Sequence, residues 1–127
     1  MVRIANIGLQ TGAGSPEDII ADVQRGIYIE GHGSFSIDQQ RYNFQFGGDA
    51  FWLIENGKRV HMLRDVIYHG ITPEFWGSCD AVAGPSHRQR YGFITCGKGQ
   101  PGQSGWMTHP AAHARFRHVS VIRGQAE

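Results

Sequence analysis

The pair Asn56-Gly57 constrains the fold of this chain more than any other local feature, because it separates two runs of β-prone residues. Trp52-Leu53-Ile54-Glu55 precedes the pair, and Lys58-Arg59-Val60-His61 follows it. A two-residue type I′ turn requires positive φ at both central positions, and Asn-Gly is a strongly preferred sequence for it. Residues 52–61 are therefore predicted to form a tight antiparallel hairpin.

This hairpin belongs to a longer region of period-two alternation, which runs from Gly26 to Leu63. Apolar residues recur at every second position in several short runs: Ile27 and Ile29; Phe35 and Ile37; Tyr42, Phe44 and Phe46. Such alternation indicates half-buried strands. The 18 glycines among 127 residues have no collagen-like period and favour turns and strands over long helices. We predict a strand meander over this region.

Further strands are expected on both sides of the meander, together with two short helices. The strand candidates are Arg3–Gln10, Arg64–His69, Tyr91–Cys96 and Ala114–Ile122. Ser15 and Pro16 are typical of a helix start, and Gly26 is expected to end that helix. Thr72-Pro73-Glu74 opens the second helix, which carries Phe75, Trp76 and Cys79 and ends before Gly84-Pro85.

These elements indicate a β-rich α+β fold with two short helices. We expect a strongly bent or barrel-like, mostly antiparallel sheet, and residues 1–127 should form a single domain. A polar loop is expected over Ser86–Arg90.

Charge and hydropathy exclude two classes of partner. The net charge is +1 and basic residues are scattered apart from His87–Arg90, so the footprint of a nucleic-acid-binding protein is absent. No apolar run approaches the 18 to 20 residues that span a bilayer, and the start of the chain lacks a secretory signal pattern. We expect a cytoplasmic protein that binds neither nucleic acid nor membrane.

The two cysteines, Cys79 and Cys96, occur in different contexts and are expected to be separate thiols rather than a disulfide. Cys96 ends an apolar run and precedes glycines that allow close approach, with Lys98 nearby to favour a thiolate. It is either a metal ligand or nucleophile, or a small buried hydrophobe at a strand end. Cys79, beside Trp76 and Val82, is interpreted as core packing.

Two other patterns suggest chemistry. Gly97–Gly102 matches G-x-G-x-x-G, but a nucleotide site needs a helix to follow, and Pro101 and the next glycines leave no helical pattern. His109 and His113 have i, i+4 spacing and with Cys96 form an alternative three-ligand site. Pro110 then occupies the position at which a zincin-like helix carries its glutamate base.

Six segments, in order, resemble the C-terminal domain of the TldD/PmbA family of metallopeptidases, also called modulators of DNA gyrase. They are Ile20-Ala21-Asp22, Arg25-Gly26-Ile27-Tyr28, Ser36-Ile37-Asp38, Asn43-Phe44-Gln45-Phe46-Gly47, Gly70-Ile71-Thr72-Pro73-Glu74-Phe75-Trp76 and Cys96-Gly97-Lys98-Gly99-Gln100-Pro101-Gly102-Gln103. The last run alone is more specific than one glycine pattern, and together the segments span nearly the whole chain.

The resemblance implies a metal site shared with a preceding domain of the same polypeptide. In the family, zinc is held by two histidines of an H-E-x-x-x-H helix and by the cysteine that matches Cys96. PmbA-like members lack that cysteine, so Cys96 implies the metal-bearing, TldD-like side. This sequence contains no H-E-x-x-x-H, so the chain alone is expected to be inactive.

The resemblance also implies a peptide substrate and an oligomer, either of identical subunits or with a PmbA-like subunit. Gly97, Lys98, Gly99 and His109 are the expected substrate contacts, since Thr108-His109 resembles a Ser-His pair of the TldD-like subgroup. The alternative is a non-catalytic binding or assembly domain, whose glycine-rich loop and strand edges dock a partner chain.

Overall fold

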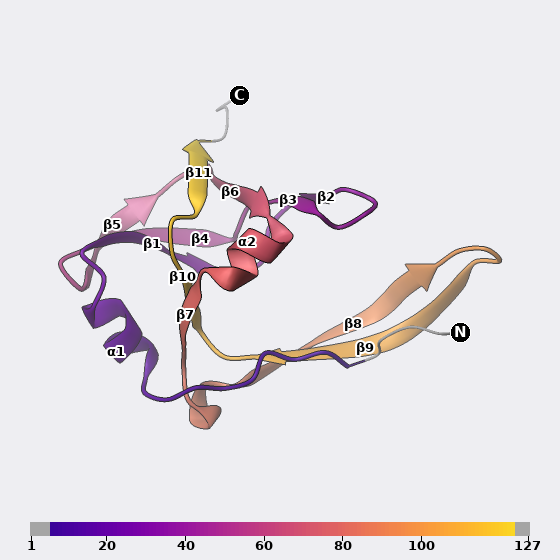
Figure 1. The fold of residues 1–127 in the computed structure, drawn as a ribbon, viewed down its shortest axis with the longest axis horizontal. Helices are drawn as coiled ribbons and strands as arrows, with labels where there is room; N and C mark the ends of the chain where they lie inside the picture. Colours follow the sequence, from indigo (N-terminus) through magenta and orange to yellow (C-terminus); the bar gives the residue numbers. More distant parts are fainter. Residues whose placement is uncertain (1–5, 124–127) are drawn as a thin grey trace. The chain divides into compact units, whose positions relative to one another are not determined.

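The computed structural model describes residues 6–123, with backbone only for residues 93–95. The helices are α1 (Pro16–Ala21), α2 (Thr72–Gly77) and the 3-10 helix η1 (Pro85–His87). The strands are β1 (Arg25–Glu30), β2 (Phe35–Ile37), β3 (Asn43–Phe46), β4 (Ala50–Glu55), β5 (Lys58–Leu63), β6 (Val66–Ile71), β7 (Cys79–Val82), β8 (Gln89–Lys98), β9 (Gln103–Ala111), β10 (Ala114–Phe116) and β11 (Ser120–Arg123) (Figure 1). None of the helices in this part of the chain has the length and apolar character that a bilayer crossing requires.

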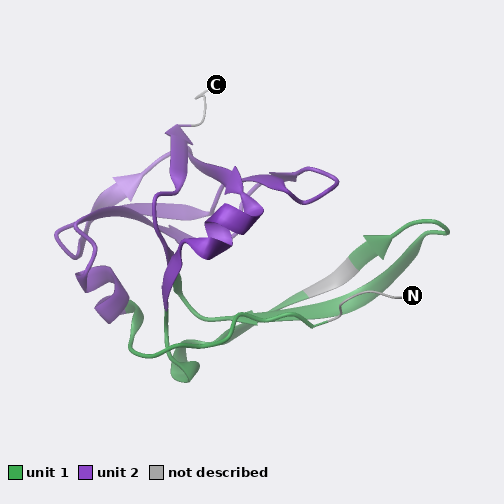
Figure 2. Ribbon diagram, in the orientation of Figure 1, with its two compact units in different colours: residues 1–16, 82–114 green, residues 17–81, 115–127 purple. Residues whose placement is uncertain are grey.

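The chain divides into two compact units, each assembled from two chain segments (Figure 2). Unit 1 comprises residues 1–16 and 82–114, and unit 2 comprises residues 17–81 and 115–127. The expectation of a single domain over residues 1–127 remains a prediction.

In unit 2, the hairpin expected at Asn56-Gly57 is confirmed. Both turn residues have positive φ, 50° at Asn56 and 74° at Gly57, and Glu55 pairs with Lys58 across the turn. A Cβ at residue 57 would lie 2.5 Å from the carbonyl oxygen of Ala21. Glycine is therefore required here both by the backbone conformation and by the close approach of α1.

A second sheet of unit 2 carries its aromatic core. Four antiparallel strands are ordered β11-β6-β3-β2. Phe44 of β3 meets Phe75 of α2 with ring centroids 4.9 Å apart, and Phe75 stacks on Phe116 of β10 at 3.9 Å. Pro73 lies in the first turn of α2, where its missing N–H costs nothing. Helix α2 therefore covers one face of this sheet (Figure 1).

Unit 1 is built on the long β8–β9 hairpin. The N-terminal segment runs beside β9 through a bridge between Asn6 and Thr108 and a hydrogen bond from the Leu9 N–H to the Pro110 carbonyl, 3.0 Å. Ala83 is fully buried, and its N–H donates to the carbonyl of His113 at 2.8 Å.

The fold class is confirmed as β-rich, with antiparallel sheets and two short α-helices. The barrel-like closure is not observed: the ladders between residues 6 and 123 form four separate sheets. The meander prediction has the strands in the right places but the wrong order, because β1 pairs with β4 rather than β2. Glu30 pairs with Ala50, so the intervening chain with β2 and β3 leaves this sheet for the other one.

Several predicted boundaries are wrong for identifiable reasons. The first helix ends at Ala21 rather than near Gly26, because the hairpin turn at Asn56 and Gly57 donates hydrogen bonds to the carbonyls of Gln24 and Val23. Of the strand expected over residues 3–10, residues 3–5 lie outside the described residues. Residues 7–10 are irregular. Their neighbour Pro110 has no N–H to continue a ladder.

The chain after Trp76 also departs from expectation. Helix α2 ends at Gly77, and Cys79 lies in strand β7 rather than in the helix. The loop expected over residues 86–90 is partly the η1 turn, and β8 begins at Gln89. The strand expected over residues 114–122 is broken at His118, whose φ is 53°. The break is needed because β10 pairs with β7 whereas β11 pairs with β6.

Candidate metal-ligand site on the β8–β9 hairpin

Cys96 lies in β8, half-buried, directly after an irregularity in the ladder. Phe93 pairs with Met107 and Cys96 pairs with Gly105, so β8 has one residue more than β9 between these two pairs. An extra residue of this kind is a β-bulge, which re-aims the side chains that follow it. Without it, Cys96 would pair with Ser104 and point to the opposite face of the ribbon.

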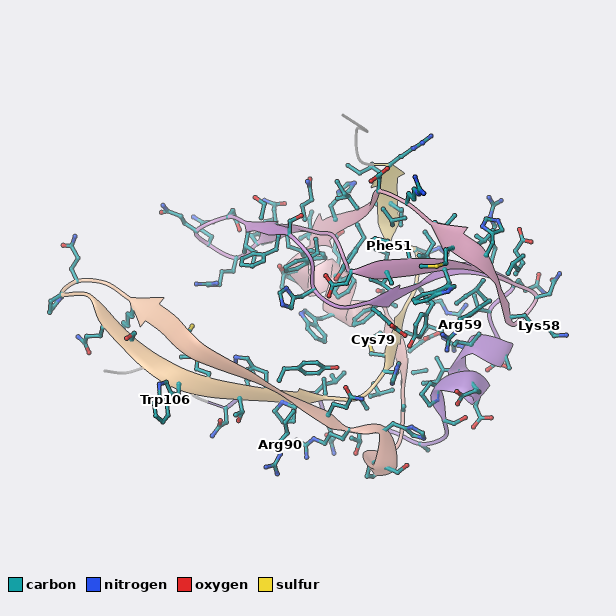
Figure 3. The ribbon with its side chains drawn as sticks, turned by 180° about the vertical axis from the view of Figure 1, so that it is seen from behind. Phe51, Lys58, Arg59, Cys79, Arg90 and Trp106 are labelled. Atoms are coloured by element: carbon teal, nitrogen blue, oxygen red, sulfur yellow. The ribbon has the colours of Figure 1, made fainter. Side chains whose placement is uncertain are left out.

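The bulge places Cys96 on a defined face of the hairpin. Alternate residues of a strand share a face, so Gly105, Met107 and His109 of β9 lie on the face of Cys96. Met107 is buried on this face. Trp106 lies on the opposite face and is 84% exposed, and Figure 3 shows it projecting from the same side of the ribbon as Arg90.

Gly97 and Gly99, which follow Cys96 in the chain, lie at open positions of the hairpin. A Cβ added at Gly97 would have its nearest neighbour at 3.9 Å, and one added at Gly99 would meet nothing within 4 Å. Neither residue has positive φ, in contrast to Gly57. Nothing in the described chain therefore requires glycine at these two positions. The space they leave is available to a group from outside the described residues.

Lys98 follows Cys96 by two positions and shares its face of β8. The two Cα atoms are separated by about 7 Å of strand, given a rise of about 3.4 Å per residue. An exposed ammonium group thus lies on the thiol side of the ribbon.

His109 shares the face of Cys96 but lies far along the ribbon. Its Nδ1 is 3.1 Å from the carbonyl oxygen of Ile7, so this nitrogen carries the proton and donates. Four positions separate His109 from Gly105, the partner of Cys96, which amounts to about 13 Å along β9. Zinc ligands lie about 2.0–2.3 Å from the ion, so Cys96 and His109 do not bind the same ion in this arrangement.

The alternative three-ligand site of Cys96, His109 and His113 is therefore wrong. Residues 109–111 are extended in β9, so the two histidines do not lie on a helical face. The described residues contain no group of three or more His, Cys, Asp or Glu side chains that could hold a metal ion. The rejection of the nucleotide site is confirmed, since β9 rather than a helix follows Gly102.

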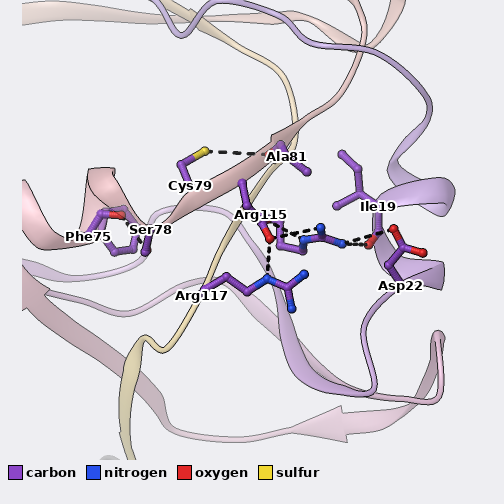
Figure 4. A network of polar contacts seen from close by, with 9 residues as sticks. Ile19, Asp22, Phe75, Ser78, Cys79, Ala81, Arg115 and Arg117 are labelled. Carbon is purple, nitrogen blue, oxygen red and sulfur yellow. Dashed lines mark hydrogen bonds and ion pairs between the residues drawn. The ribbon is translucent and has the colours of Figure 1, made fainter.

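Cys79 has the surroundings of a structural thiol. It is half-buried in β7, and its Sγ lies 3.9 Å from the carbonyl oxygen of Ala81 (Figure 4). Burial raises the pKa of the Cys79 thiol, which disfavours the thiolate that metals and electrophiles require. The two cysteines thus differ in surroundings: Cys96 adjoins an open glycine-rich turn, whereas Cys79 is packed inside unit 2.

A hydrogen-bond network around Asp80 was not predicted from the sequence. Arg115 of β10 donates to the Asp80 carboxylate from Nε at 2.7 Å and from Nη2 at 3.2 Å, and Arg117 donates from its own Nε (Figure 4). These hydrogen bonds lower the pKa of Asp80 to about 2. Nη1 of Arg115 also donates to the carbonyl of Ile19 at 2.9 Å. The network joins β7, β10 and α1 and is structural.

Comparison with known families places these features in context. The family model described as the PmbA/TldA metallopeptidase C-terminal domain matches residues 1–120. A metalloprotease of Methanothermobacter thermautotrophicus is 31% identical over 121 residues, which are 95% of this chain and 26% of that protein. A metalloprotease of Methanocaldococcus jannaschii is 30% identical over 82 residues, 65% of this chain and 18% of that protein. The chain thus spans about a quarter or less of the length of these relatives.

Solved structures share the fold. TldE from Thermococcus kodakarensis superposes with a TM-score of 0.73 and 20% sequence identity, covering 96% of this chain and 24% of its own. A putative modulator of DNA gyrase from Bacteroides thetaiotaomicron superposes with a TM-score of 0.54 and 27% identity, covering 58% of this chain and 17% of its own.

Proposed function

The chain belongs to the PmbA/TldA metallopeptidase C-terminal domain family, and from this premise we propose that it serves a larger, metal-dependent peptidase by contributing Cys96 as a zinc ligand. In this proposal the other ligands and the general base come from a preceding domain of the same polypeptide. The substrate is a peptide, and the parent protein acts in the cytoplasm as an oligomer, either of identical subunits or with a PmbA-like subunit.

The position of Cys96 is the observation that carries the proposal. The bulge in β8 turns this thiol onto the face it shares with Gly105, which has no side chain to fill the position across from Cys96. Thiolate sulfur is a strong zinc ligand, but a catalytic zinc needs three protein ligands. The described residues offer no such set of three, so the donor set fits a shared site to which this chain adds one ligand.

Residues around Cys96 have proposed roles in substrate binding. Gly97 and Gly99 have no side chains, and therefore allow an extended peptide backbone to approach the ribbon closely at these two positions. Lys98 and His109 lie on the face of Cys96 and are the proposed polar contacts. The Nδ1–H bond to Ile7 holds the His109 ring in place. Zinc, when bound, would supply Lewis-acid activation of the scissile carbonyl.

The test is a matched pair of cysteine variants in the full-length protein that contains this chain. Cys96→Ser should lose bound zinc and peptide hydrolysis together, because a hydroxyl is a poor replacement for a thiolate ligand. Cys79→Ser should keep both, since Cys79 only packs inside unit 2. Metal content is measured by elemental analysis and activity with unfolded peptide substrates. Equal zinc content in the wild type and Cys96→Ser would overturn the ligand assignment.

A further inference from the structure

One face of the four-stranded sheet of unit 2 carries a row of polar side chains that crosses all four strands. The register places Ser36, Gln45, His69 and Ser120 directly across from one another on β2, β3, β6 and β11. We call these four residues the polar row. At about 4.8 Å between neighbouring strands, the polar row is about 14 Å long.

The opposite face of the same sheet holds the aromatic core. The adjacent register row consists of Phe35, Phe46, Tyr68 and Val121. Phe46 and Tyr68 are in contact, with ring centroids 5.8 Å apart. Successive residues of a strand point to opposite faces, so the polar row faces away from this core. The sheet therefore stabilises unit 2 with one face and presents hydrogen-bonding groups on the other.

The polar row is not used by the protein itself. None of its four side chains makes a hydrogen bond or an ion pair with any part of the chain that the structure describes. The hydroxyl, carboxamide and imidazole groups of the row therefore have hydrogen-bonding capacity that the described part of the chain does not use. Its chemistry suits a ligand that brings several hydrogen-bonding groups of its own.

A groove of about 640 Å³ is lined by all four residues of the polar row. It extends to the end of the sheet where β6 continues into α2, because Ile37, Phe44, Gly70 and Glu74 also line it. The groove is open to solvent rather than enclosed. Among the described residues, Asp38 and Glu74 line the groove as its two acidic residues, and no lysine or arginine lines it. Oδ1 of Asp38 accepts backbone hydrogen bonds from Tyr42 at 2.7 Å and Asn43 at 3.1 Å, which hold this carboxylate in place. The groove therefore favours a cationic ligand.

We propose that this groove binds a peptide segment carrying a lysine or arginine side chain. The backbone amides of an extended peptide would pair with the polar row, and the basic side chain would meet Asp38 and Glu74. A small free amine would contact the two carboxylates but would be too short to hydrogen-bond along the polar row. The length of the polar row therefore favours a peptide. The site lies entirely within unit 2 and does not depend on Cys96.

The binding test uses the chain and three fluorescein-labelled pentapeptides, Ala-Ala-X-Ala-Ala, in which X is lysine, norleucine or glutamate. Fluorescence anisotropy should give a dissociation constant for the lysine peptide about tenfold below that of the norleucine peptide, as expected for one charge-assisted contact. The glutamate peptide should bind more weakly still. Equal affinities for all three peptides would overturn the charge argument.

Matched variants then locate the site. Glu74→Gln and His69→Ala should each weaken binding of the lysine peptide, whereas Glu55→Gln and His61→Ala, which change the same residue types at exposed positions outside the groove, should not. Cys96→Ser should bind normally, so a failure of the zinc proposal and a failure of this one are distinguishable. Circular dichroism checks that every variant is folded. Equal effects of the groove variants and the control variants would refute the site. If N-acetyl-lysine amide competed as strongly as the unlabelled lysine pentapeptide, the groove would be a site for an amine rather than for a peptide, and the proposal would be overturned.

Discussion

At the scale of single residues, the same amino acid has different constraints at different positions of this chain. Gly57 has positive φ and a carbonyl oxygen 2.5 Å from where its Cβ would be, whereas Gly99 has neither a positive φ nor a neighbour within 4 Å. The dipeptide Asn-Gly made the first of these predictable. Cys96 was predictable only as a strand-end residue: period-two alternation carries no signal for an inserted bulge, so the face of its thiol required the structure.

Asp80 supports a prediction with a defined pH dependence. Asp80→Asn removes the charge that receives hydrogen bonds from Arg115 and Arg117, and should lower the free energy of unfolding at pH 7 by about 1 kcal/mol, since the network is partly exposed. The pKa of Asp80 is about 2 in the folded chain, against about 3.9 for an unfolded aspartate. A depressed carboxyl pKa stabilises the fold above the unfolded value.

The contribution of Asp80 is therefore present above about pH 4 and is lost as the pH falls through about 2. Urea unfolding of the wild type and Asp80→Asn should differ at pH 7, and the difference should shrink as the pH falls through about 2. Asp65→Asn is the control, because it removes the same charge at an exposed turn residue whose φ of 54° asparagine tolerates. A constant difference between wild type and Asp80→Asn across this range would contradict the assigned pKa.

At the scale of elements, local chemistry predicted where strands and helices lie but not how they pair. Alternation marked β3, β4 and β5, and Thr72-Pro73 marked the start of α2. The alternation of apolar and polar residues does not indicate which strands pair with each other. For example, β1 pairs with β4 although a long connection separates them. The helix predicted through Cys79 ends early, because Ser78 N–H and Oγ bond to carbonyls of the last turn. The following residues then pair with β10.

The two hairpins supply an element-scale prediction about glycine. Gly57→Ala should destabilise unit 2 by about 2 kcal/mol or more, from left-handed strain and the clash with Ala21. Gly92→Ala in β8 should change stability by less than about 0.5–1 kcal/mol, because a Cβ there meets nothing within 4 Å. Thermal unfolding monitored by circular dichroism measures both. Comparable losses in the two variants would show that Gly92 has a structural constraint of its own.

At the scale of the whole molecule, large apolar side chains lie exposed in both units. Trp106, Phe35 and Met62 are 84%, 66% and 61% exposed. A chain that spans about a quarter or less of the length of its curated relatives has neighbouring protein that could cover such side chains if they form a contiguous patch.

Because the proposed metal site is shared with another domain, we predict that the 127-residue chain alone hydrolyses no peptide and binds zinc weakly. Its described residues hold no group of three potential ligands, and its sequence has no H-E-x-x-x-H to supply a base. Zinc is titrated into the chain, its Cys96→Ser variant and its His109→Ala/His113→Ala variant. Zinc binding should be far weaker than in the full-length protein and should weaken further without Cys96. It should be unaffected by loss of the two histidines, which lie too far along the chain from Cys96 to complete the site.

The full-length protein, assayed in parallel with and without chelator, is the positive control. Tight one-to-one binding that vanishes in the histidine variant, or chelator-sensitive hydrolysis by the chain alone, would place a complete site in these 127 residues and overturn the shared-site proposal.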